Sequence, residues 1–266
     1  MSDSFQQAVS DALPVLRNIR GGFGPHPTAT LAALQKLKKR GIGILPMREK
    51  TAHRQDADAT TAGTLDPLRE AALACVKCPH LVESRTQVVF GAGNPEAELM
   101  FVGEAPGANE DEQGEPFLGK AGQLLTKIIQ AMGYTREEIY IGYVLKCRPD
   151  LPAGVSGNRK PKSEEMSACL PWLEKQIALI KPRALVALGA TAVEGLLGKT
   201  EPVDKLRGRW LEFQGIPVMT TYHPADLLSN QSLTEKRKVW EDMLLVLEKL
   251  EKPISEKQRQ FFTKAG

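Results

Sequence analysis

The sequence of 266 residues lacks two features that would place the protein in or beyond a membrane. No apolar run approaches the ~20 residues that a membrane-spanning helix needs. The first residues, which include Ser2-Asp3-Ser4, do not have the basic and then apolar pattern of a secretory signal peptide. We therefore expect a cytoplasmic protein that has no membrane partner.

The sequence has few cysteines and little net charge. The chain has four cysteines, and in an intracellular protein such a small number indicates metal ligands or free thiols rather than disulfides. The net charge is +3 and the isoelectric point is near 8.6, a bias that permits nucleic-acid binding without indicating it. Hydrophobic residues make up 42% and charged residues 25%, as in an ordinary globular protein with a core.

The N-terminal quarter of the chain differs from the rest. Short helices are predicted around Val9–Leu16 and Thr28–Arg40, and Met47–Thr64 is polar and rich in Ala, Thr and Asp, as in a linker. We therefore expect an N-terminal extension over residues 1–64, a folded domain over residues 65–252 and a C-terminal tail over residues 253–266.

From Leu65 onward, short apolar runs alternate with patterns of helical period, which predicts an α/β fold with helices on both faces of a parallel sheet. The expected strands are Leu99–Val102, Ile139–Leu145, Ala184–Leu188 and Ile216–Met219. The expected helices are Gln123–Met132, Glu164–Ile180, Thr191–Leu197 and Glu235–Leu250.

Three unusual clusters each follow an expected strand: Gly103–Gly122, Lys146–Pro149 and Thr221–Pro224. Glycines alone would be typical of an ordinary connection, but the acidic pair Glu110-Asp111 and the isolated Phe117 in the first cluster favour a pocket. In parallel sheets, ligands bind beyond the carboxyl ends of the strands. We therefore expect the three clusters to converge at one edge of the sheet.

The four cysteines are arranged as one close pair and two single residues. Cys75 and Cys78 form a CxxC, which places two thiolates around one metal, whereas Cys147 and Cys169 stand alone. Zinc fingers usually repeat the CxxC, while an iron–sulfur cluster tolerates a pair plus two distant ligands. From spacing alone, a zinc ion and a [4Fe–4S] cluster are equally supported, and two buried thiols beside an unrelated CxxC are a third reading.

The stretch Thr221–Leu228 contains a histidine placed rigidly by the proline that follows it, since Pro224 restricts the backbone of His223. A single histidine is more often a structural hydrogen-bonding group than a catalyst. Leu227 and Leu228 are expected on a loop, where exposed leucines can insert into a base stack. Basic residues nearby, such as Arg207 and Lys236, give weak support for nucleic acid.

Taken together, these motifs resemble the family-4 uracil-DNA glycosylases, the iron–sulfur branch of the uracil-DNA glycosylase superfamily. The matching stretches are Arg85–Gly91, Gly103–Gly122, Lys146–Pro149, Asn158–Pro161 and Thr221–Leu228. The resemblance implies a three-layer α/β/α sandwich around a short four-stranded parallel sheet. It also implies a monomer that acts on uracil-containing DNA and carries a [4Fe–4S] cluster on Cys75, Cys78, Cys147 and Cys169.

The resemblance also assigns roles to residues of this sequence. Glu104 and His223 correspond to the catalytic acid and to the histidine that stabilises the leaving uracil anion, and Phe117 to the ring that stacks on the flipped base. Leu227 or Leu228 corresponds to the wedge that fills the vacated stack. The further substrate-binding positions are Gly103, Ala105, Gly107, Tyr143 and Asn158.

Three departures from the family pattern bear on function. Tyr143 stands where the family usually has an asparagine that reads the uracil edge, which puts base selectivity in question. The stretch between Arg148 and Asn158 is several residues longer than is usual in the family, and Ser229 stands where the family commonly has an arginine. Both changes concern the contact with DNA. Two alternatives therefore remain beside uracil excision: a glycosylase with shifted base choice, and a non-catalytic iron–sulfur protein that binds damaged DNA.

Overall fold

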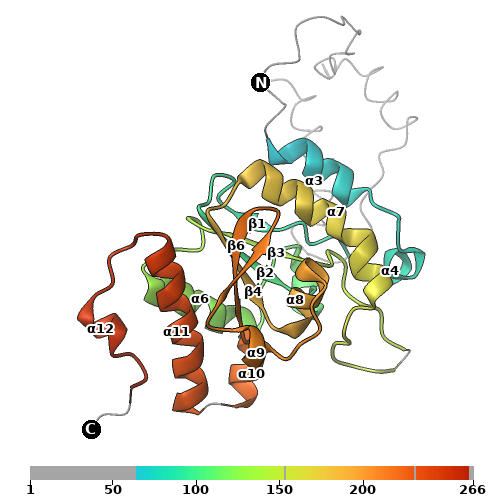
Figure 1. Cartoon of the computed structure of the whole chain (residues 1–266). Coiled ribbons are helices and arrows are strands. Elements are labelled where there is room, and N and C mark those ends of the chain that lie inside the picture. Colours follow the sequence, from blue (N-terminus) through green and yellow to red (C-terminus); the bar gives the residue numbers. More distant parts are fainter. Residues whose placement is uncertain (1–63, 153, 231, 264–266) are drawn as a thin grey trace, which may run out of the picture. The chain divides into compact units, whose positions relative to one another are not determined.

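Four parallel strands form the centre of a six-stranded sheet, whose order is β1-β3-β2-β4-β6-β5 (Figure 1). The computed structural model describes residues 64–152, 154–230 and 232–263, so the helices and linker expected before residue 64 lie outside the described part. The central strands are β3 (Tyr140–Tyr143), β2 (Leu99–Gly103), β4 (Ala184–Leu188) and β6 (Ile216–Thr221). They are the four strands that the sequence predicts, although β3 is shorter and β6 longer than expected.

Two antiparallel edge strands, β1 (Ala92–Gly93) and β5 (Trp210–Phe213), complete the sheet and were not predicted. β1 has only two residues and therefore gives no apolar run. β5 pairs with β6 through a two-residue turn, in which Gln214 and Gly215 both have positive φ angles of 50° and 82°. This is the backbone of the tight turns that join antiparallel strands.

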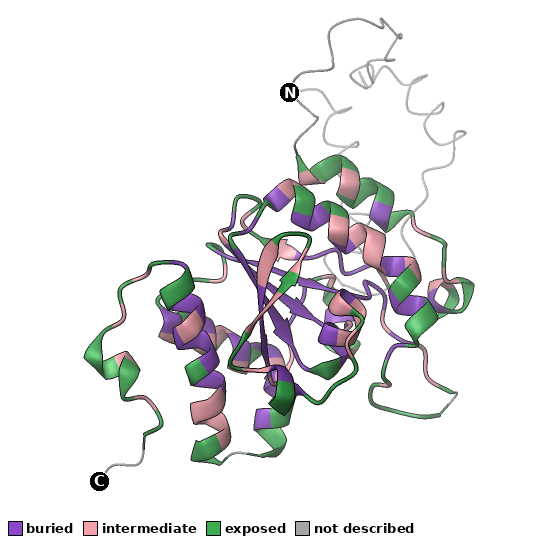
Figure 2. Cartoon of the chain, viewed as in Figure 1, coloured by how far each residue is buried: buried purple, intermediate pink, exposed green. Residues whose placement is uncertain are grey.

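Helices cover both faces of the sheet, and alternate residues of β2 face different helices. Leu99 and Phe101 pack in the core that contains α6 (Lys120–Met132) and α11 (Leu233–Lys249). Met100 and Val102 pack in the core that contains α7 (Ser163–Ile180) and α8 (Ala190–Leu197). Figure 2 shows the buried strands between these helices. The predicted three-layer α/β/α arrangement is confirmed.

The remaining helices are short. They are α3 (Leu65–Leu73), α4 (Pro79–Ser84), α5 (Ala108–Gln113), α9 (Val203–Leu206), α10 (Pro224–Ser229) and α12 (Glu256–Arg259). The last of these lies in a C-terminal segment that packs on the domain, because Phe261 contacts the Trp240 ring and Gln258 donates to the Ala131 carbonyl. In the described residues, no helix is long and apolar enough to cross a membrane.

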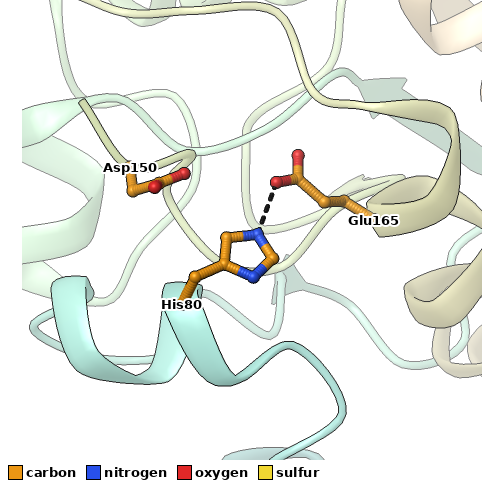
Figure 3. A group of neighbouring side chains, drawn as sticks. All are labelled: His80, Asp150 and Glu165. Carbon is orange, nitrogen blue, oxygen red and sulfur yellow. Dashed lines mark hydrogen bonds and ion pairs between the residues drawn. The ribbon is translucent and has the colours of Figure 1, made fainter. Parts of the chain in front are cut away.

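An ion-pair clasp, formed by His80, Asp150, Arg159 and Glu165, joins three segments that each carry a cysteine. Figure 3 shows three of its members, His80, Asp150 and Glu165. The Glu165 carboxylate accepts from His80 Nε2 at 2.7 Å and from both terminal nitrogens of Arg159 at 2.9 and 2.6 Å. Arg159 also contacts the Asp150 carboxylate and donates through Nε to its carbonyl at 2.7 Å. His80 follows Cys78, Asp150 follows Cys147, and Glu165 precedes Cys169 by one helical turn.

Glu165 is the buried member of this clasp, since only 2% of its side chain is exposed. Burial would raise the pKa of its carboxyl group, but the hydrogen bonds from Arg159 and His80 outweigh burial and lower that pKa to about 2. The Lys162 backbone N–H adds a further hydrogen bond at 2.8 Å. Glu165 is therefore charged at neutral pH and depends on its partners for compensation.

We predict that Arg159→Met lowers the free energy of unfolding by about 3 kcal/mol, because it leaves a buried carboxylate without its main cation. Urea denaturation at pH 7 would measure the loss. The matched control is Lys160→Met, since Lys160 is the next cation along the chain and pairs with Glu194 on the surface at 2.7 Å. This control should change stability by less than about 1 kcal/mol. Equal effects of the two substitutions would contradict the role given to the clasp.

Candidate active site and cysteine cage

The three clusters predicted to meet do converge at the carboxyl ends of β2, β3 and β6. The pairing of β2 with β3 continues beyond the strands, because Val144 N–H donates to the Gly103 carbonyl and Leu145 N–H to the Glu104 carbonyl, both at 3.0 Å. Phe117 from the glycine-rich loop lies against Tyr143, the last residue of β3, and also against His223 after β6. The start of the first cluster is thus fixed through the backbone to the two residues that lead into the second.

The buried carboxylate of Glu110 organises the glycine-rich loop. It accepts hydrogen bonds from the backbone N–H groups of Gly107 at 3.1 Å, Leu118 at 2.8 Å and Gly119 at 2.9 Å. These bonds tie the start of α5 to the start of α6 and enclose the segment that contains Phe117. The sequence shows Glu110 only as part of an acidic pair, and its position three residues after Gly107, in the first turn of α5, is the available signal.

Phe117 has a left-handed backbone, with φ at 54°, and the surrounding groups hold it there. Its N–H donates to the Tyr143 hydroxyl at 2.9 Å, and Arg136 donates to the Pro116 and Phe117 carbonyls at 2.7 and 3.3 Å. Two glycines make room for it: a Cβ on Gly122 would lie 1.8 Å from the Phe117 carbonyl oxygen, and a Cβ on Gly103 would lie 2.6 Å from the Phe117 ring. The sequence did not reveal the part played by Arg136.

A stack of three rings forms the centre of the site. The Phe117 ring lies 5.0 Å from the Tyr143 ring and 5.7 Å from the His223 ring, with an angle of 29° in both pairs. Tyr143 is 3% exposed, and its hydroxyl oxygen is occupied by the Phe117 N–H. Tyr143 therefore supports the glycine-rich loop, because its ring packs on Phe117 and its hydroxyl oxygen accepts from the Phe117 backbone N–H.

Glu104 follows β2 and lies beside the first turn of α8. Burial raises the pKa of its carboxyl group, while a hydrogen bond with Thr191 and the nearby Lys160 oppose the shift. The carboxylates of Asp226 and Glu194 act in the same direction as burial. Glu104 is thus a partly buried acid. Its backbone is fixed at the edge of the sheet because its carbonyl accepts from the Leu145 N–H.

His223 is held in one tautomer by its own helix. It is the N-cap residue of α10, and its Nδ1 accepts from the Ala225 N–H at 3.1 Å. Burial lowers the pKa of the imidazole, although Asp226 and Glu110 oppose this shift, so the ring is neutral near pH 7. A neutral ring that accepts at Nδ1 carries its proton on Nε2. His223 therefore presents an N–H donor from Nε2.

A second buried carboxylate fixes the strand end that leads to His223. Asp242 is fully buried on α11 and accepts from the Thr221 hydroxyl at 2.7 Å, from Arg207 at 3.0 and 3.1 Å, and from the Gly208 N–H at 3.1 Å. Burial raises the pKa of Asp242 to about 6, against the effect of these hydrogen bonds. The end of β6 is thus anchored to α11.

The two leucines after His223 differ in position, and the prediction that they lie on a loop was wrong. Both belong to α10, which is only six residues long and begins at a proline, so it gives no helical period in the sequence. Leu227 is 5% exposed and packs inward, whereas Leu228 is 37% exposed. Leu228 is therefore the leucine of the pair that is open to contact from outside.

The other predicted substrate-binding positions fall on two sides of the site. Asn158 borders the glycine-rich loop, because a Cβ on Gly107 would lie 3.4 Å from its Nδ2 atom. Ala105 packs instead against the cluster that contains Leu81, Leu145 and the buried cysteines. The side chain of Ala105 therefore belongs to the cysteine side of the loop.

The fold gathers the four cysteines, here called the cysteine cage, around one place. Cys147 and Cys169 are buried in one apolar cluster, Cys78 packs against it, and all four thiols are free. Burial raises the pKa of Cys78, and the neighbouring Cys147 and Cys75 raise it further. Burial likewise raises the pKa of Cys169 to about 11. The cysteine cage thus brings together thiols from three separate segments.

The positions of the cysteine sulfurs can be compared with the spacing that a single zinc ion requires. Four thiolates on one zinc ion lie about 3.8 Å apart, because each Zn–S bond is about 2.3 Å long. In the part of the chain that the structure describes, the group of ligand atoms that all lie within 4.8 Å is His80, Asp150 and Glu165, without a cysteine. Arg159 already lies between the two carboxylates of that group. Three or more sulfurs of the cysteine cage therefore do not all lie within 4.8 Å of one another in the structure.

Comparison with known proteins agrees with this geometry. The family description of the uracil DNA glycosylase superfamily matches residues 90–244. The type-4 uracil-DNA glycosylase of Thermotoga maritima is 40% identical over 205 residues, which cover 76% of this chain and 96% of that protein. The type-4 uracil-DNA glycosylase of Sulfurisphaera tokodaii is 40% identical over 67% of this chain and 81% of that protein. The chain is a member of the uracil-DNA glycosylase superfamily and, within it, of the type-4 uracil-DNA glycosylases.

Proposed function

We propose that this protein is a DNA repair glycosylase that flips uracil out of DNA and hydrolyses its N-glycosidic bond, leaving an abasic site. The observation that carries the proposal is the fixed tautomer of His223, whose Nε2–H is presented beside the Phe117 ring. We place this activity in residues 65–252 and expect the enzyme to work as a monomer in the cytoplasm.

The residues of the site fit the demands of the reaction. As the bond between C1′ and N1 breaks, the sugar becomes positively charged and the base leaves as an anion. A donor such as Nε2–H of His223 stabilises the developing charge at the O2 atom, and a group of this kind is commonly worth about 3–4 kcal/mol. The Glu104 carboxylate orients the water that adds to C1′ or offsets the charge on the sugar. The departing base takes up the remaining proton.

Base extrusion costs a few kcal/mol, and stacking on Phe117 offsets part of that cost. Stacking on an aromatic side chain contributes about 1–3 kcal/mol per base. The Phe117 ring has Tyr143 and His223 as ring neighbours, so a base that stacks on Phe117 enters beside these two rings. Leu228, the exposed leucine of α10, is placed to fill the space that the base leaves.

Tyr143 bears on which base is removed. An asparagine amide offers one donor and one acceptor to the uracil edge, and so rejects cytosine, whose pattern is reversed. The Tyr143 hydroxyl already accepts from the Phe117 N–H and cannot enforce that pattern by itself. This supports a glycosylase with weaker uracil excision and broader base choice, unless another group replaces the amide.

We further propose that Cys75, Cys78, Cys147 and Cys169 hold a [4Fe–4S] cluster. No three sulfurs of the cage all lie within 4.8 Å of one another, and the thiols combine buried and half-buried positions; both features support this choice over zinc. When bound, the cluster would cross-link the segment that leads into α4, the loop after β3 and α7. Its ligands stand apart from the ring stack, so the cluster has a structural task in this scheme.

We expect His223→Ala to lower single-turnover uracil excision by about 10²–10³, because the anion loses its donor. Gel-based cleavage of the abasic product would measure the rate, and binding to uracil-containing duplex should persist. His223→Asn is the matched control, since an asparagine retains the N-cap of α10 but not the donor position. If the Asn variant regains wild-type activity, then His223 acts only as a helix cap.

The proposed [4Fe–4S] cluster can be tested separately through the metal content of the protein. Purified protein should contain about four iron atoms and absorb visible light, as iron–sulfur proteins do. Cys147→Ser should lose the iron and much of the solubility, because one of the buried ligands is removed. Metal analysis of the wild type decides the point: one zinc per chain and no colour would rule the cluster out.

For Tyr143 we expect Tyr143→Asn to increase uracil excision and to sharpen rejection of other bases, because a site built for paired hydrogen bonds discriminates strongly. A panel of duplexes, each with one modified base, would give the excision rates. Tyr143→Phe is the control, since it removes only the hydroxyl that holds Phe117 and should leave base choice unchanged. Exclusive uracil excision by the wild type, with no change in Tyr143→Asn, would show that selectivity lies elsewhere.

A further inference from the structure

An apolar groove lies between α6, α10, α11 and the segment that follows α12, and the proposed chemistry does not use it. These elements lie together in the fold, since α6 packs against α10 and α11, and Phe261 after α12 packs on the Trp240 ring (Figure 1). The groove has a volume of about 220 Å³. The apolar residues that line it include Leu124, Ile128, Leu227, Val239, Trp240 and Phe262.

The size and lining of the groove suit a side chain rather than a cofactor. Pockets for small molecules usually measure about 300–1,000 Å³ and contain a few polar groups that orient the ligand. This groove is smaller, and its lining is apolar apart from two lysines. Phe262 at its edge is 41% exposed, and Leu233, which begins α11, is 56% exposed. Contiguous apolar surface of this kind is typical of sites that bind other proteins.

The two lysines of the groove, Lys127 on α6 and Lys236 on α11, supply positive charge on two different walls. Helix α6 contains no Asp or Glu, and the residues three and four positions away from Lys236 are all uncharged. Among the ion pairs of the described residues, none includes either lysine. Lysine covers apolar surface with its stem and keeps its ammonium group in water. The groove therefore has a positive rim, which is complementary to acidic groups that accompany an apolar one.

We propose that this groove is the docking site for an acidic, amphipathic segment of a partner protein. One large apolar side chain of the segment, aromatic or leucine, fills the groove, and Asp or Glu residues on either side of it pair with Lys127 and Lys236. Anchors of this kind carry most of the binding energy in protein interfaces. DNA is a poorer fit, because contacts to its backbone come from polar and basic groups, whereas this lining is apolar. The interaction is separate from base excision and does not depend on it.

The probe is a library of short random peptides, displayed on phage and selected on the full-length protein. We expect the recovered peptides to combine an aromatic residue or leucine with Asp or Glu on both sides. Fluorescence anisotropy of one labelled peptide then gives its affinity. Lys127→Glu and Lys236→Glu should each weaken binding about fivefold, because each replaces an attraction at the rim by a repulsion. The matched control is Lys249→Glu, which makes the same change of charge at an exposed position of α11 outside the groove and should leave the affinity unchanged.

A second variant, Ala131→Phe, fills the groove without changing its charge. Ala131 is a half-buried residue of α6 that lines the groove. A phenylalanine there occupies the space that the apolar anchor needs, so the peptide should no longer bind. Uracil excision and binding to uracil-containing duplex should stay at wild-type values. If circular dichroism shows that Ala131→Phe does not fold, the two lysine variants, which alter only the rim, provide the test.

Three results would overturn the proposal. The first is a selection that yields no peptide whose binding is weakened by Ala131→Phe or by the lysine variants. The second is weaker binding of duplex DNA with a smaller salt dependence in both lysine variants, which would assign the groove to the DNA backbone. The third is a dimer of the wild type in sedimentation experiments that Ala131→Phe abolishes, because the occupant would then be a second copy of this chain.

Discussion

Buried carboxylates that accept hydrogen bonds from backbone and guanidinium groups hold the loops on which this protein depends. Glu110 closes the glycine-rich loop, Asp242 anchors the end of β6 before His223, and Glu165 joins the segments of the cysteine cage. Each replaces hydration with several fixed donors, which is the condition under which a buried charge stabilises a fold. These hydrogen bonds fix the irregular segments to the helices and strands beside them.

The two functional regions are connected through one short piece of backbone. Tyr143 is the last residue of β3 and belongs to the ring stack. Cys147 follows four residues later and belongs to the cysteine cage. Between them, Val144 and Leu145 continue the pairing with β2, and the Lys146 carbonyl accepts from Val89 N–H at 2.8 Å. A displacement of the cysteine cage would therefore reach the support of Phe117 directly.

Much of this arrangement was predictable from the sequence. The four central strands and the helices beside them have apolar runs or helical periods long enough to recognise, and the rule for ligand sites in parallel sheets placed the clusters together. The short helices α5 and α10 were missed, because six residues that begin next to Gly107 or with Pro224 resemble a loop. Edge strand β1 has no apolar run at all.

Long-range polar contacts were the other feature that the sequence did not predict. No sequence pattern indicates that Glu165 binds both His80 and Arg159, or that Asp242 accepts a hydrogen bond from Thr221. These contacts form only once distant segments of the chain have packed together. Tyr143 was recognised as unusual, but the direction of its hydroxyl depends on the left-handed backbone of Phe117. Local patterns carry no information of that kind.

The wide separation of the cysteine segments along the chain has a consequence for biosynthesis. A ribosome adds roughly 5–20 residues per second, so on the order of ten seconds pass between the synthesis of Cys78 and that of Cys169. During that time the CxxC pair lacks the other two cysteines of the cage, and for most of it Glu165 has not yet been made. Insertion of the proposed cluster would therefore follow the folding of α7, and the nascent thiols need a reducing environment until then.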